Sequence, residues 1–64
     1  MKEKILKKLY KMWLFREEAQ KDSPIYAIRN ARLNGAIDLL KAIGYKVDFN
    51  PLAEGKNPFT IKEI

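Results

Sequence analysis

The chain has 64 residues, enough for one domain and too few for two, and it carries a formal net charge of +5 at pH 7. It contains neither Cys nor His, which excludes disulfides, thiol nucleophiles, imidazole bases and the usual zinc sites. Short chains bury little surface, yet 47% of the residues here are hydrophobic, so we expect a homodimer or higher homo-oligomer.

The net positive charge of the chain comes entirely from its N-terminal quarter. Residues 1–16 hold six basic groups against one acidic group, a net +5, whereas residues 17–64 hold seven of each. Such asymmetry suggests an acidic partner, which would be a nucleic acid, an anionic membrane surface or an acidic protein face.

A first helix is predicted over residues 2–21, because apolar side chains from Ile5 to Trp13 recur there at steps of three and four residues. A lysine stripe falls on the flank opposite Trp13 and consists of Lys4, Lys7, Lys8 and Lys11. Such runs are usually solvated, but they also supply sequence-independent attraction to nucleic-acid phosphates. A membrane-surface helix is the weakest interpretation, since the apolar side is needed to pack a second helix.

That second helix is predicted over residues 24–43. Ser23 suits the N-cap, Pro24 the first helical position, and Gly44 the left-handed conformation that ends a helix. The short link between the helices makes them antiparallel neighbours. The apolar arc of the second helix is wider than a surface helix needs, so we expect it to be covered on at least two sides.

Beyond Gly44 the period of the pattern changes from helical to alternating. Tyr45, Val47 and Phe49 alternate with polar residues, which predicts a strand over 45–49, and a second strand is predicted over 59–64. The predicted fold is therefore mainly α and a single domain over 1–64. It consists of an antiparallel two-helix hairpin followed by a short β-hairpin or an extended tail, assembled as a homo-oligomer.

All three arginines, Arg16, Arg29 and Arg32, project onto the apolar arcs of their helices. A charge in such a place needs a partner, since an unpaired buried charge is costly. One interpretation pairs each arginine, within the chain or across a subunit interface, with a carboxylate such as Glu17, Glu18 or Asp38. The other has the three converge on a phosphate or an acidic group of a partner, which a guanidinium binds with two parallel hydrogen bonds.

A row of small residues, Ala27, Ala31, Gly35 and Ala42, lies along the second helix. Gly35 costs about 1 kcal/mol relative to Ala inside a helix, which is either simply tolerated or compensated by close approach of another helix. Aromatic residues such as Trp13 are more often interface anchors than platforms for stacked bases. The predicted oligomer interface consists of Trp13, Phe15, Ala31, Gly35 and Leu39.

Catalytic patterns are missing, so we expect no enzyme, no cofactor and no metal. The favoured function is a stoichiometric binding protein for a protein target, of the kind that phages and mobile elements encode to inhibit a host protein. One alternative is a basic nucleic-acid-associated protein that uses the lysine stripe, and another is an oligomeric sponge that binds a nucleotide or other small anion through the arginines. No apolar run reaches the roughly 20 residues that span a bilayer, so we expect a cytoplasmic protein without membrane contact.

Overall fold

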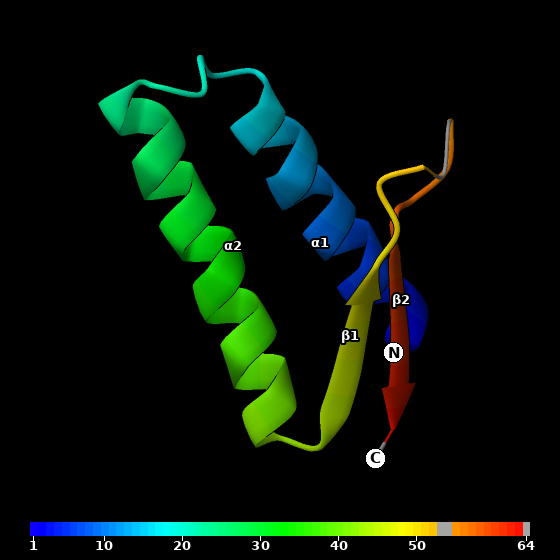
Figure 1. Ribbon diagram of the computed structural model, residues 1–64. Coiled ribbons are helices and arrows are strands. Elements are labelled where there is room, and N and C mark those ends of the chain that lie inside the picture. The colour runs from blue at the N-terminus through cyan, green and yellow to red at the C-terminus, as the bar shows by residue number, and fades with distance from the viewer. Residues whose placement is uncertain (53–54, 64) are drawn as a thin grey trace.

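The computed structural model describes residues 1–52 and 55–63, which form two helices followed by two strands (Figure 1). Helix α1 spans Lys2–Glu17 and helix α2 spans Pro24–Ala42, and the two lie side by side in opposite directions. Strands β1, Tyr45–Phe49, and β2, Phe59–Glu63, form an antiparallel sheet. The mainly helical hairpin followed by a β-hairpin is thus confirmed.

The link between the helices is longer than the sequence suggested, because α1 ends at Glu17 and not at residue 21. Residues 18–23 reverse the direction of the chain. Pro24 restricts the residue before it, Ser23, which is extended (ψ 153°) and directly precedes α2. The predicted cap at Ser23 is confirmed. Its hydroxyl accepts a hydrogen bond from the Tyr26 amide at 3.1 Å and donates one to the Gln20 carbonyl at 2.6 Å.

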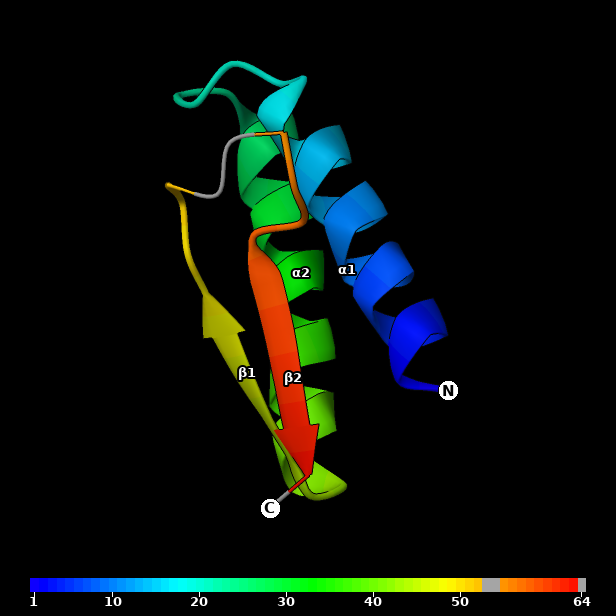
Figure 2. The same cartoon turned by 90° about the vertical axis from the view of Figure 1, so that its right-hand side faces the viewer.

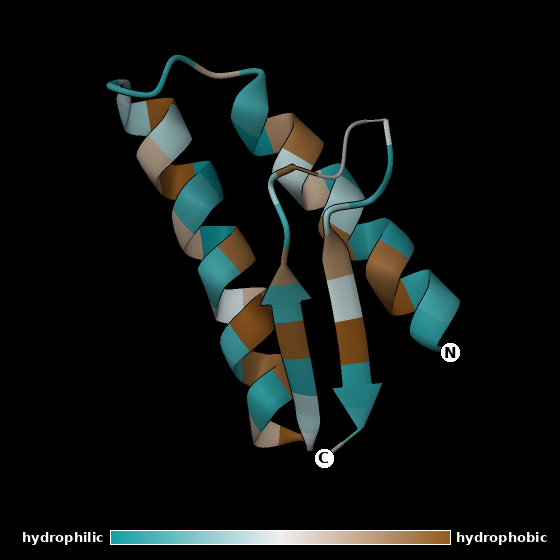
Figure 3. Ribbon diagram, turned by 45° about the vertical axis from the view of Figure 1, so that its right-hand side comes forward, coloured by the Kyte–Doolittle hydropathy of each residue, from teal (hydrophilic) through white to brown (hydrophobic). Residues whose placement is uncertain are grey.

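The end of α2 and the strands follow the sequence pattern closely. Gly44 has a φ of +97°, the left-handed conformation expected just past a helix end. Along β1 and β2 apolar and polar residues alternate (Figure 3), and the register pairs Val47 with Ile61 and Phe49 with Phe59. Ile64, the last residue of the predicted second strand, lies outside the described residues.

The core is small and lies between the helix pair and the sheet. Its buried members are Leu9, Leu33, Leu40 and Phe59. Strand β1 contacts α2 and strand β2 contacts α1, so the sheet covers one face of the helix pair (Figure 2). Within the described part of the chain no element covers the opposite face. Helix α2, expected to be covered on two sides, leaves four large apolar side chains 55–64% exposed: Ile25, Ile28, Leu39 and Ile43.

Candidate functional site

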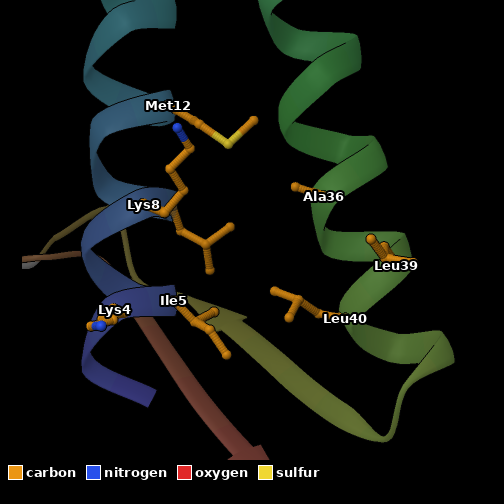
Figure 4. Close-up of a pocket in the computed structure, with 8 residues that line it drawn as sticks. Lys4, Ile5, Lys8, Met12, Ala36, Leu39 and Leu40 are labelled. Atoms are coloured by element: carbon orange, nitrogen blue, oxygen red, sulfur yellow. The ribbon is translucent and has the colours of Figure 1, made fainter. Parts of the chain in front are cut away.

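An apolar hollow of about 310 Å³ lies between α1 and α2 on the face that the sheet leaves uncovered (Figure 4). Ile5 and Met12 extend from α1 toward α2, and Leu40 extends from α2 toward α1. We call this hollow the interhelical groove. It is lined by Lys4, Ile5, Lys8, Leu9, Met12, Ala36, Leu39 and Leu40.

The shape of the groove follows from side-chain size on α2. Ala36 lies between the buried Leu33 and Leu40 on the side of α2 that packs against the core, and its single methyl group fills little of the space between the helices. Leu39 follows Ala36 by three residues and lies at the rim of the groove, where its side chain is 64% exposed to solvent. The groove is therefore an open apolar trough and not a closed cavity.

Basic side chains lie along the α1 side of this trough and at one end of it. Lys4 and Lys8 line it from α1, and a second hollow of about 280 Å³, which we call the arginine end, continues from it toward the helix–helix link. Lys8 and Met12 line both hollows, and Phe15, Arg29 and Arg32 complete the arginine end. Among the residues that the structure describes, no carboxylate lines either hollow, so this face of the helix pair carries uncompensated positive charge.

Arg29 is held in place by the end of α1. Its Nη1 donates a hydrogen bond to the Phe15 carbonyl at 2.7 Å, and its guanidinium carbon lies 3.5 Å from the centroid of the Phe15 ring. Phe15 lies in the last turn of α1, where carbonyls lack intrahelical donors and the helix dipole favours a cation. The contact occupies one of five guanidinium N–H groups and leaves the arginine oriented along the surface.

Arg16 lies apart from the other two arginines. It lines a separate hollow of about 220 Å³ on the sheet side, together with Trp13 and Phe49. Its Nη1 donates to the Asn30 side-chain oxygen at 2.8 Å, and its Nε lies 3.7 Å from a Glu17 carboxylate oxygen. The structure therefore brings Arg29 and Arg32 together with Lys8, and gives Arg16 local partners between the two helices.

The four residues of the lysine stripe are also divided between two surfaces. All four lysines are exposed, but only Lys4 and Lys8 line the groove. Lys7 and Lys11 belong to the outer surface of α1. In the described residues the Arg16–Glu17 contact is the one ion pair, so no acidic group of these residues neutralises the stripe.

The residues of the predicted oligomer interface separate into two groups. Trp13 packs inside the chain, between α1 and the sheet. Its ring stacks on the Tyr10 ring with 6.1 Å between the ring centroids, and its centroid lies 6.2 Å from that of the Phe49 ring. Phe15 is 47% exposed beneath Arg29. The other three predicted residues, Ala31, Gly35 and Leu39, are exposed on α2.

Two features were not found from the sequence. The groove itself was missed, because the stripe from Ile5 to Met12 was assigned entirely to packing against the second helix. Asn57 was also missed: its amide nitrogen donates to the Leu6 carbonyl at 2.9 Å, while its oxygen accepts from the Phe59 amide at 3.0 Å. The Asn57-Pro58 pair indicates a turn in the sequence, but nothing in it reveals a tether to α1.

Comparison with models of known protein families, with curated proteins and with solved structures gave no significant match. Neither α1 nor α2 has the length and hydropathy needed to cross a membrane. Over the described ranges, 1–52 and 55–63, acidic side chains nowhere gather in a group that could hold a metal ion.

Proposed function

We propose that this protein is a non-enzymatic binding protein that acts stoichiometrically on a protein partner through the uncovered face of its helix pair. The observation that carries the proposal is the interhelical groove, an apolar trough beside a helix whose exposed face holds four large apolar side chains. Contiguous exposed apolar surface of this kind marks interaction sites on small proteins. Inhibition of a target, as expected from the sequence, would follow from occupation of the target's own working surface.

The proposal is tested by site-specific photo-crosslinking in the cell that encodes the chain. A photoreactive phenylalanine analogue replaces Leu39 at the rim of the groove, and in a matched variant it replaces Ala27, which is exposed on the polar side of α2. We expect a discrete protein adduct of one-to-one stoichiometry from position 39 and none from position 27. Equal adducts from both positions, or no protein adduct from position 39, would overturn the proposal.

Nucleic-acid binding is the second candidate, and the observation that favours it is the exposure of the whole lysine stripe. Lys7 and Lys11 distinguish it from the first, because they lie outside the groove. A gel-shift assay at low salt should show a complex that fades as salt rises and that Lys7→Glu with Lys11→Glu removes. If the protein retards neither DNA nor RNA in the gel at low salt, the lysine stripe does not bind nucleic acid.

We also propose that copies of the chain associate through the outer side of α2, as the composition suggests. The support is the exposure of Ile25 and Ile28, two large apolar side chains of α2 that line neither the groove nor the arginine end. The same exposed face of α2 carries Leu39 at the rim of the groove, so self-association and partner binding use neighbouring residues.

A further inference from the structure

We infer that the occupant of the interhelical groove is an amphipathic helix of the partner protein whose apolar stripe is flanked by carboxylates. The inference deepens the proposed function and rests on it, because it names the chemistry of the partner segment. Three properties of this face lead to it: its length, its apolar floor and the arrangement of its cations.

The length of the face fits a helix of several turns. The residues that line the groove and the arginine end run from Lys4 to Phe15 on α1, which corresponds to about 16 Å at the α-helical rise. A partner helix of about three turns placed along the trough would put side chains spaced by three and four residues over Ile5, Met12 and Leu40. This is the usual way in which an amphipathic helix enters an apolar groove.

The cations are placed diagonally along the trough. Because α1 and α2 are antiparallel, Lys4 and Lys8 line the α1 side in the half near the start of α1, while Arg32 and Arg29 belong to the α2 side in the half near the helix–helix link. The remaining rim is apolar, with Leu39 opposite the lysines and Phe15 beside the arginines. A complementary helix therefore carries acidic residues on one flank of its apolar stripe in its first half. In its second half the acidic residues lie on the other flank.

The same charges disfavour the other occupants of an apolar groove. A second copy of this chain would bring four more cations to the same face, and like charges across an interface are repulsive. A nucleic acid would satisfy the cations but would leave the floor at Ile5 and Met12 against phosphates and water. A single fatty acyl chain would cover the floor, yet it would leave Leu39 exposed at the rim.

The arginine end gives the helix its orientation. Arg29 is already fixed by the Phe15 carbonyl and ring, so its unoccupied N–H groups are presented without further loss of conformational freedom. A carboxylate of the partner placed there would receive charge-assisted hydrogen bonds from Arg29 or Arg32 at the edge of an apolar surface. Lys4 and Lys8 contribute attraction at longer range and speed the encounter.

The test identifies the segment that the groove captures. The adduct formed from position 39 is digested and the attached partner peptide is sequenced. We expect a peptide with apolar residues at steps of three and four and an excess of Asp and Glu beside them. Attachment to a basic or extended segment, to a lipid, to nucleic acid or to a second copy of this chain would overturn the inference.

A pair of charge reversals tests the role of the cations separately. Lys4→Glu with Lys8→Glu should reduce the yield of the adduct roughly tenfold, because two attractive contacts become repulsive. The control is Lys46→Glu with Lys62→Glu, which makes the same change in net charge on two exposed, register-paired residues of the sheet and should leave the yield unchanged. Equal losses in both variants would contradict a directed contact with an acidic segment.

The outcomes keep the inference and the proposed function distinct. A protein adduct at position 39 that is absent at position 27, but that comes from a non-acidic segment, refutes the acidic helix and leaves the binding function standing. Absence of any protein adduct at position 39 refutes both. Circular dichroism of each variant establishes that its helices are intact before the yields are compared.

Discussion

Gly35 lies in the middle of α2, where its backbone freedom is a cost and no tertiary contact in the described structure compensates for it. No atom lies within 4 Å of the position that a Cβ would take. Gly35→Ala should therefore raise the free energy of unfolding by about 1 kcal/mol, since Ala is the better helix former and meets no obstacle. Urea denaturation of both proteins measures the difference.

The matched control for that substitution is Gly44→Ala. Gly44 also has open space around its Cβ position, but its φ of +97° is a conformation that side chains strain. This variant should lose stability, by about 1 kcal/mol. If Gly35→Ala were the destabilising one, Gly35 would be required for close approach of another helix.

Ser23 provides a second residue-scale prediction. Its hydroxyl satisfies the Tyr26 amide at the start of α2, and that amide has no other partner within the helix. Ser23→Ala should lower the free energy of unfolding by about 1 kcal/mol, whereas Ser23→Asp should retain the cap and most of the stability. Thermal unfolding followed by far-UV circular dichroism distinguishes the two, and equal losses would contradict a capping role.

At the scale of elements, the sequence predicted most where one local signal decides the structure. Ser23-Pro24 marks the start of α2, Gly44 marks its end, and the alternation from Tyr45 to Phe49 marks a strand. Each of these depends on backbone conformation or on one face of one element. The end of α1 was misplaced by four residues, because its helical pattern continues past Phe15 and gives no sign of how many residues the reversal requires.

The candidate site was less predictable, because its contacts join residues far apart in the chain. The Phe15 carbonyl is available to Arg29 only because α1 ends at Glu17, and that end point was itself mispredicted. The division of the arginines, with Arg16 on the sheet side and Arg29 near the groove, depends on which face of the helix pair the sheet covers. No pattern within either helix determines that choice.

Asn57 couples the β-hairpin to α1 and provides the element-scale prediction. Asn57→Ala removes both its bond to the Leu6 carbonyl and its bond to the Phe59 amide, which should cost about 1–2 kcal/mol of unfolding free energy. The exchange rate of the Phe59 amide proton should rise in the same variant. Asn57→Asp keeps the acceptor for Phe59 but loses the donor to Leu6, so it should preserve slow exchange at Phe59 while still losing stability.

At the scale of the whole molecule, one layer of helices rests on one small sheet, so each helix has a covered and an uncovered side. The buried core consists of Leu9, Leu33, Leu40 and Phe59, while apolar residues as large as Ile25 and Leu39 remain exposed. A chain built in this way carries more apolar surface than its own fold uses. That surplus supports the proposed function in binding.

Self-association through the outer side of α2 is the prediction that belongs to this scale. In sedimentation equilibrium at micromolar concentration, we expect the protein to form a dimer or higher oligomer. Ile28→Glu should weaken that association more than about tenfold, because burial of one Ile side chain is worth about 1.5–3 kcal/mol and a carboxylate in its place resists desolvation. Lys4→Glu with Lys8→Glu, on the groove face, should not weaken it. A protein that sediments as a strict monomer would refute the oligomer. Equal weakening by both variants would mean that copies meet across the groove itself.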